Sequence, residues 1–193
     1  ALTDTAAIEP LPPQPILGLR AMGVDAPSAR QIRDVYAAYD RNNRPNILFV
    51  CTLQRLLRVE ISRPEGYTPE RSGWSPPAEL PPLVKMVEAD EMPAATLALA
   101  QAVGSWGFPE GTGFLPGVYR HLANWPAYMA YAGSSLWPLL ESGEVLRAGK
   151  SIADAAGAAA DSLVIKLPEP PGDFRLPTAE QTATLLTVLD SMT

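Results

Sequence analysis

Prolines divide this chain more sharply than any other feature of its sequence. Most of the 21 prolines lie in three clusters, at residues 10–15, 64–82 and 168–177. Proline lacks the backbone N–H and fixes φ, so such clusters interrupt both helices and central strands. Between the clusters, apolar residues recur every three or four positions, and no alternating run of β-branched residues is long enough for a sheet. The sequence therefore predicts an all-α fold, a bundle of six to eight helices with long proline-rich connectors.

The length of the chain suits one domain. Its 193 residues are enough to bury a substantial core, so we expect a single helical domain over residues 1–193. Residues 1–24 are expected to form an extended proline-rich arm, and residues 60–82 a proline-rich connector. Connectors of this length in compact domains tend to be lids, binding loops or subunit arms.

Helical periodicity predicts where the helices lie. A first helix should follow Asp25, and a second should run from about Asn46 to Val59, beyond a polar break at residues 40–45. The second helix is apolar around most of its circumference, so Cys51 is interpreted as a core residue. The last helix should follow Thr178, which forms a capping box with Gln181. Further helical patterns cover residues 83–90, 94–106, 118–125, 127–140 and 144–167.

Charge and residue usage exclude several classes of function. A net charge of −6 argues against a nucleic-acid surface, which needs clustered Lys and Arg. No apolar run reaches the roughly 18 to 20 residues of a membrane-spanning helix, so no membrane partner is expected. One cysteine and one histidine cannot build an internal disulfide or a Cys/His zinc cage, and no phosphate-loop pattern is present. We expect a cytoplasmic protein with no metal and no cofactor.

Three groups of residues are candidates for a site. His121 is the only imidazole and the default general base near neutral pH; the alternative is a histidine that packs between helices and bonds a backbone carbonyl. Asn43 and Asn46 lie at a predicted helix start, where amides and free N–H groups can bind a small anion, or where one Asn simply caps the helix. Aromatic side chains either wall an apolar pocket or fill the core: Trp106, Trp125, Trp137, Tyr119, Tyr128 and Tyr131.

Three segments resemble the group I 2-haloacid dehalogenases. Residues 114–128, FLPGVYRHLANWPAY, are similar to that family's repeat signature, in which an aromatic residue and Arg precede a Leu-Ala pair and Trp-Pro. Residues 39–48, YDRNNRPNIL, resemble its Asn-rich helix start, and residues 80–83, LPPL, resemble the linker into its second repeat. The resemblance covers roughly residues 30 to 140.

The resemblance implies an all-helical protein of two related repeats that pack as a pseudo-dimer, with no metal or organic cofactor. This chain resembles one and a half repeats, which implies a homodimer. In the family, an Asp activates water, which displaces the halogen and inverts the carbon, while an Asn helps hold water or substrate. The implied site here comprises Asn43 or Asn46 with Gly117, Val118 and Tyr119. Val118 stands where the family has its Asp, and valine cannot accept a proton.

Three functions stay open at this point. The first is hydrolysis of a small 2-halocarboxylic or related acid, with His121 and Tyr119 as candidate catalytic residues. The second is a non-catalytic relative that binds a small carboxylic acid or serves as a dimeric structural or interaction protein. The third is a thiol peroxidase of the alkylhydroperoxidase D-like helical superfamily. That chemistry needs a pair of cysteines near a histidine, and Cys51 has no second cysteine.

Overall fold

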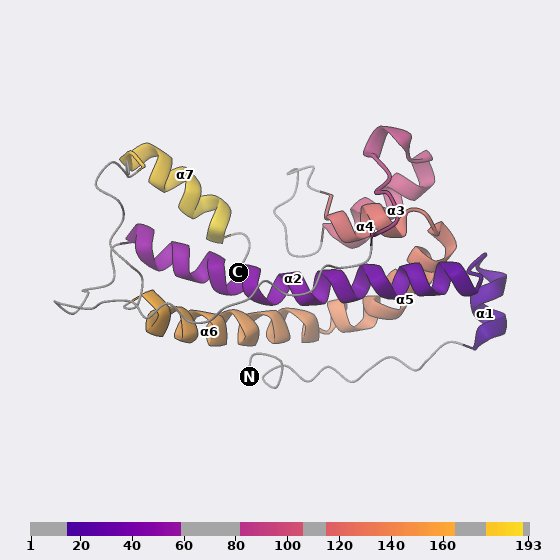
Figure 1. Cartoon of the computed structure of the whole chain (residues 1–193), viewed down its shortest axis with the longest axis horizontal. Helices are drawn as coiled ribbons and strands as arrows, with labels where there is room; N and C mark the ends of the chain where they lie inside the picture. Colours follow the sequence, from indigo (N-terminus) through magenta and orange to yellow (C-terminus); the bar gives the residue numbers. More distant parts are fainter. Residues whose placement is uncertain (1–14, 59–81, 106–114, 165–176, 191–193) are drawn as a thin grey trace. The chain divides into compact units, whose positions relative to one another are not determined.

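The computed structural model describes residues 15–58, 82–105, 115–164 and 177–190, and every regular element in these ranges is helical (Figure 1). The prediction of an all-α fold of six to eight helices is confirmed. Two predictions fall largely outside the described residues. They are the connector, at residues 60–81, and the arm, at residues 1–14. The elements are α1 (Ile16–Ala21), α2 (Ala26–Arg58), η2 (Ala89–Glu91), α3 (Ala94–Gly104), α4 (Gly117–Leu122), α5 (Pro126–Glu141), α6 (Glu144–Val164) and α7 (Ala179–Asp190).

The chain divides into two compact units, a division that the sequence did not indicate. One unit, here called the His121 unit, contains α1, α2 up to Asn42, η2, α3, α4, α5 and the start of α6. The other, called the Cys51 unit, contains α2 from Asn43, most of α6, and α7. No helix in the described parts of the chain is long and apolar enough to cross a membrane.

Helix α2 is continuous over 33 residues, so the break predicted at residues 40–45 is wrong. Its start is as expected, because the Asp25 carboxylate accepts a hydrogen bond of 2.8 Å from the Ser28 N–H. The Ser28 side chain, and then this N–H, lower the Asp25 pKa. Pro45 lies inside the helix and removes one bond, to the Arg41 carbonyl. Residues 42–46 are exposed, and buried residues on both sides of Pro45 hold the helix together.

Residues 16–21, which precede α2, are helical. The prediction of an extended arm is therefore wrong at these positions. Gly23, with φ of 76°, ends this short helix. The Gly23 N–H bonds the Arg20 carbonyl, and the Val24 N–H bonds the Leu19 carbonyl, which is the Schellman arrangement. Leu19 and Met22 pack against the core, and this apolar contact stabilises a helix that is too short to be stable alone.

The core of the His121 unit gathers side chains from most of its elements. Pro126 begins α5, one residue before the helical pattern predicted at residues 127–140, and the corner between α4 and α5 places Trp125 in this core. Partly buried residues of α3, α4 and α5 surround it, Tyr119 and Tyr128 among them. The buried members are Val24, Ile32, Met92, Ala100, Leu122, Ala123, Trp125 and Met129.

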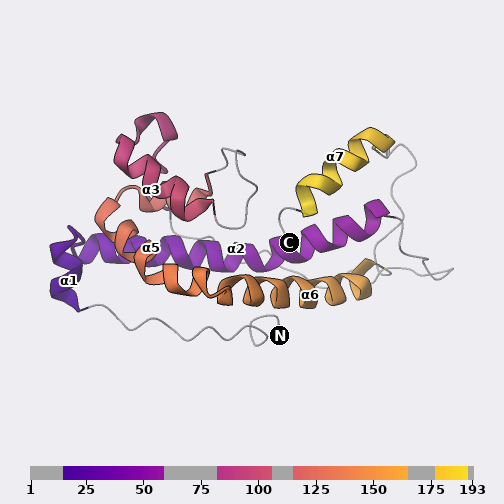
Figure 2. The same cartoon turned by 180° about the vertical axis from the view of Figure 1, so that it is seen from behind.

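In the Cys51 unit, the second half of α2 and α6 run side by side in the same direction (Figures 1 and 2). Cys51 packs against Ala156 and Ala160, and its thiol donates a weak hydrogen bond to the Ala153 carbonyl. The cysteine is buried, as predicted, and burial raises its pKa, so this thiol has little thiolate character. Arg55 pairs with Asp161 at 2.7 Å on the edge of the same contact.

Helix α7 completes the Cys51 unit. The capping box predicted at its start is confirmed: the Gln181 N–H donates to the Thr178 hydroxyl, and the Thr178 N–H donates to the Gln181 side chain. At its other end, the Asp190 carboxylate accepts hydrogen bonds of 2.8 Å from the Gln54 amide and 2.6 Å from Arg58. These bonds attach the end of α7 to α2.

Candidate functional site

His121 lies on α4, the short helix that begins at Gly117 directly after Pro116. The residue is 6% exposed. The ring of Tyr39, from α2, meets the imidazole edge-on, with 5.9 Å between the ring centres and 73° between the planes. A Cβ at Gly117 would fall against the Tyr39 hydroxyl, so the absence of a side chain at this position allows Tyr39 to approach α4.

The imidazole of His121 is neutral near pH 7. Burial has the largest effect on its pKa and lowers it, the Val84 backbone raises it, the Arg120 charge lowers it, and the net direction is downward. Nδ1 is buried and has no hydrogen-bond partner among the described residues.

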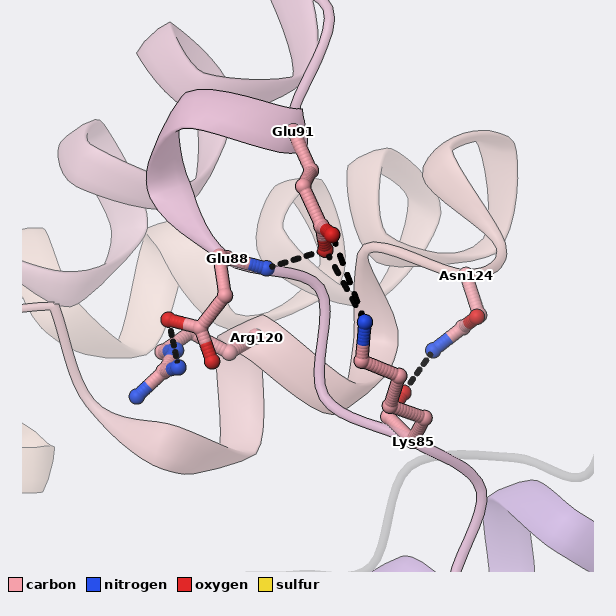
Figure 3. Close-up of polar contacts among 5 residues, drawn as sticks. All are labelled: Lys85, Glu88, Glu91, Arg120 and Asn124. Carbon is pink, nitrogen blue, oxygen red and sulfur yellow. Dashed lines mark hydrogen bonds and ion pairs between the residues drawn. The ribbon is translucent and has the colours of Figure 1, made fainter.

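Val84 belongs to an irregular segment, residues 82–88, here called the strap. Figure 3 shows how its main chain and side chains meet the end of α4. The Asn124 amide donates to the Lys85 carbonyl at 3.0 Å, and the Val87 N–H donates to the Arg120 carbonyl at 3.1 Å. The Glu88 carboxylate pairs with Arg120 (Figure 3).

The helix predicted at residues 83–90 is wrong, because the strap bonds to α4 and its flanks instead of to itself. Only Ala89–Glu91 is helical, as the 3-10 turn η2. The Glu88 N–H donates to the Glu91 carboxylate at 3.2 Å, and Lys85 pairs with the same carboxylate at 3.3 Å, so the turn has its own cap (Figure 3). These bonds lower the Glu91 pKa.

Tyr119 faces away from His121, although both were candidate catalytic residues. Residues that are two positions apart on an α-helix, as these are, lie about 200° apart around its axis. The two side chains therefore leave α4 on different sides. Tyr119 lies beside α3, where a Cβ at Gly104 would be 3.3 Å from its ring. Burial raises the Tyr119 pKa, and it also raises the pKa of Tyr36. The phenols of Tyr119 and Tyr36 are therefore protonated at neutral pH.

The other predicted binding residues differ in their surroundings. Gly117 adjoins Tyr39 as described, whereas Val118 is partly buried and packs against the core of the His121 unit. Asn43 and Asn46 are exposed in the middle of α2, within the Cys51 unit. Because no helix begins there, the anion site expected from a helix start is absent at these residues.

Among the aromatic candidates, Trp125 and Tyr128 belong to the core, Trp137 is 40% exposed, and Trp106 lies outside the described residues. The described parts of the chain contain no group of three or more His, Cys, Asp or Glu side chains placed to hold a metal ion.

Sequence reasoning missed the partners of His121. Tyr39 was named only within residues 39–48, the segment that resembles an Asn-rich helix start, and the strap was predicted to be a helix. No spacing in the sequence relates residues 39 and 121, because their contact is tertiary. No protein-family model, curated protein or solved structure matches this chain.

Proposed function

We propose that this chain is a cofactor-independent hydrolase of small 2-halocarboxylic or related acids, similar in its chemistry to group I 2-haloacid dehalogenases. The observation that supports the proposal is the buried, unpaired Nδ1 of His121. A neutral imidazole that carries its proton on Nε2 offers Nδ1 as an acceptor. Water is the smallest hydrogen-bond donor that can fill such a position. His121 would then supply the proton acceptor that Val118 cannot.

The proposed reaction is a direct displacement. Nδ1 of His121 accepts a proton from water while the water oxygen bonds to C2 of the acid. The bond from C2 to the halogen breaks, the halide leaves with the electron pair, and the carbon inverts to give a 2-hydroxy acid. The imidazolium then returns its proton to solvent. A lowered pKa weakens the base, but it keeps His121 unprotonated and competent at neutral pH.

Halide release from each enantiomer of 2-chloropropionate tests the proposal. We expect release from one or both enantiomers and a loss on the order of 10²- to 10⁴-fold in the His121→Asn variant, since general-base catalysis contributes about that much. Lys150→Gln is the matched control, because Lys150 pairs only with exposed Asp154 on α6 in the other unit. It should release halide at the wild-type rate.

Two results would contradict this reaction. One is the absence of halide release from both enantiomers by the wild-type protein. The other is an undiminished rate in a His121→Asn variant that still unfolds cooperatively on heating, because the imidazole would then have no part in the displacement.

A non-catalytic relative that binds a small acid is the second candidate. Val118 favours it, because this side chain packs in the core, and no carboxylate of the described residues is hydrogen bonded to Nδ1 of His121. A thermal-shift experiment with 2-chloropropionate and lactate distinguishes the two. Ligand at 100 times its dissociation constant adds about 2.7 kcal/mol to the free energy of unfolding. Stabilisation without halide release supports a binding protein, and no effect of either acid supports a structural role.

A further inference from the structure

The Tyr39 side chain lies along the face of α4 that carries His121. Gly117 and His121 are four residues apart, so they share one face of this helix. The Tyr39 ring meets the imidazole edge-on, and its hydroxyl is next to Gly117, where a Cβ would overlap it. A single side chain from α2 therefore contacts both positions on α4.

This contact restricts how the imidazole can turn. Edge-on aromatic pairs have a preferred geometry, because the positive edge of one ring is attracted to the negative face of the other. The Tyr39 ring also occupies the space beside the imidazole, and His121 is almost completely buried. Nδ1 has no hydrogen-bond partner among the described residues, so no polar contact of its own fixes its direction. Its direction therefore depends on the packing of the ring.

We propose that Tyr39 is a positioning residue for His121, and that Gly117 sets the place of the Tyr39 ring by leaving room for its hydroxyl. The inference rests on the proposed function only for the use of the imidazole as a base. Tyr39 acts through the imidazole and takes no part in proton transfer. If its ring were lost or displaced, the imidazole could turn and water could reach it from the side of α2.

The atoms at Gly117 allow a specific test of this arrangement. A Cβ there would overlap the Tyr39 hydroxyl but would lie 3.4 Å from Cζ of the same ring, which is an ordinary contact. Gly117→Ala should therefore displace a tyrosine at position 39 but accommodate a phenylalanine, which lacks the hydroxyl. The second substitution Tyr39→Phe should restore the contact with His121 that Gly117→Ala disrupts.

Gly133→Ala is the matched control for this restoration. A Cβ at Gly133 would be 2.8 Å from the Val103 side chain, so alanine overpacks α5 against α3 in the same unit without involving Tyr39. Both glycine variants should lower the free energy of unfolding. Addition of Tyr39→Phe should recover that loss in Gly117→Ala and leave it unchanged in Gly133→Ala.

The single histidine allows a direct measurement in the full-length protein. In the wild type we expect a nuclear Overhauser effect between the ring protons of Tyr39 and those of His121, and Tyr39→Leu should shift the His121 ring protons. In Tyr39→Leu and in Gly117→Ala, diethyl pyrocarbonate should modify the imidazole roughly two- to tenfold faster, the factor expected for loss of one aromatic pair. Tyr39→Phe alone, and Tyr39→Phe combined with Gly117→Ala, should react at the wild-type rate.

Two results would overturn the proposal. One is a wild-type modification rate with unshifted His121 ring protons in Tyr39→Leu. The other is a fast rate in Gly117→Ala that persists when Tyr39→Phe is added. Should Gly117→Ala alone fail to fold by circular dichroism, recovery of folding in the double variant supports the same contact, and continued failure contradicts it.

The proposed reaction and the positioning of His121 can fail separately, because none of these measurements needs a substrate. Absence of halide release from the wild type would refute the hydrolase and leave the contact of Tyr39 with His121 as measured. Where halide is released, Tyr39→Leu should lower kcat more than it changes KM, and Tyr39→Phe should retain the wild-type kcat.

Discussion

At the residue scale, Gly117 determines how closely Tyr39 approaches α4. A Cβ at this position would fall against the Tyr39 hydroxyl, so Gly117→Ala must displace the Tyr39 ring from its edge-on contact with His121. We expect the free energy of unfolding to fall by about 1–3 kcal/mol, as for other overpacked sites, measured by urea denaturation.

Gly149→Ala is the matched control for that prediction. Gly149 is exposed within α6, and an added Cβ would meet no atom within 4 Å. Alanine should therefore stabilise the helix by about 0.5–1 kcal/mol, because glycine loses more backbone entropy on folding. If Gly117→Ala were instead as stable as Gly149→Ala, Tyr39 would not be confined against α4.

Single residues were predictable only where their own type limits the choice. The burial of Cys51 followed from the apolar side of a helix, and the structure confirms it. His121 was a candidate because it is the only imidazole, but its contact with Tyr39 joins segments that have no periodic relation in the sequence. Val118 was placed by resemblance, and its packing against the core was not foreseen.

At the scale of elements, periodicity predicted helices better than it predicted their ends. The pattern on each side of Pro45 is helical, yet proline and the polar residues before it suggested two helices where there is one. The strap shows the opposite error. Its apolar spacing suits a helix, but hydrogen bonds to Arg120 and Asn124 hold its backbone in another conformation. Tertiary bonds of this kind leave no local signal.

Asp190 provides a test of how α7 is attached. Its carboxylate accepts hydrogen bonds from Gln54, which is buried, and from Arg58. Asp190→Ala removes both bonds, and we expect a loss of about 1–2 kcal/mol in the free energy of unfolding, because each bond has a charged partner but the site is half exposed. Faster amide hydrogen exchange in α7 should accompany that loss.

Asp154→Ala is the matched control for Asp190→Ala. Asp154 pairs with Lys150 one turn away on the exposed side of α6, a type of pair that contributes only about 0.3–0.5 kcal/mol. Equal losses in the two variants would contradict a specific attachment of α7 through Asp190.

At the scale of the whole molecule, the proline clusters and helical spacing predicted the fold class correctly, but not the division into two units. Helix α2 belongs to both units, and the boundary after Asn42 falls within the polar residues 40–45, where a break between two helices was predicted instead. Apolar residues cover most of the circumference of its second half, so this part of the helix was expected to be mostly buried. Phe49 is instead 64% exposed, and Leu56, seven residues later, is exposed on the same side of the helix.

We expect this chain to be a homodimer, and the exposed apolar side of α2 leads to a specific test. Phe49, half-buried Leu53 and Leu56 follow each other at spacings of four and three residues, which forms a stripe suited to packing against another helix. In a twofold dimer the same stripe is used twice, and each buried Phe contributes about 1.5–3 kcal/mol.

Light scattering at micromolar concentration should give twice the chain mass of 20.7 kDa. Phe49→Glu should shift the protein toward monomer with little change in the helical content of each chain, because this side chain is already exposed. A wild-type mass of 20.7 kDa would contradict the dimer, and a dimer that survives Phe49→Glu would place the contact on another surface.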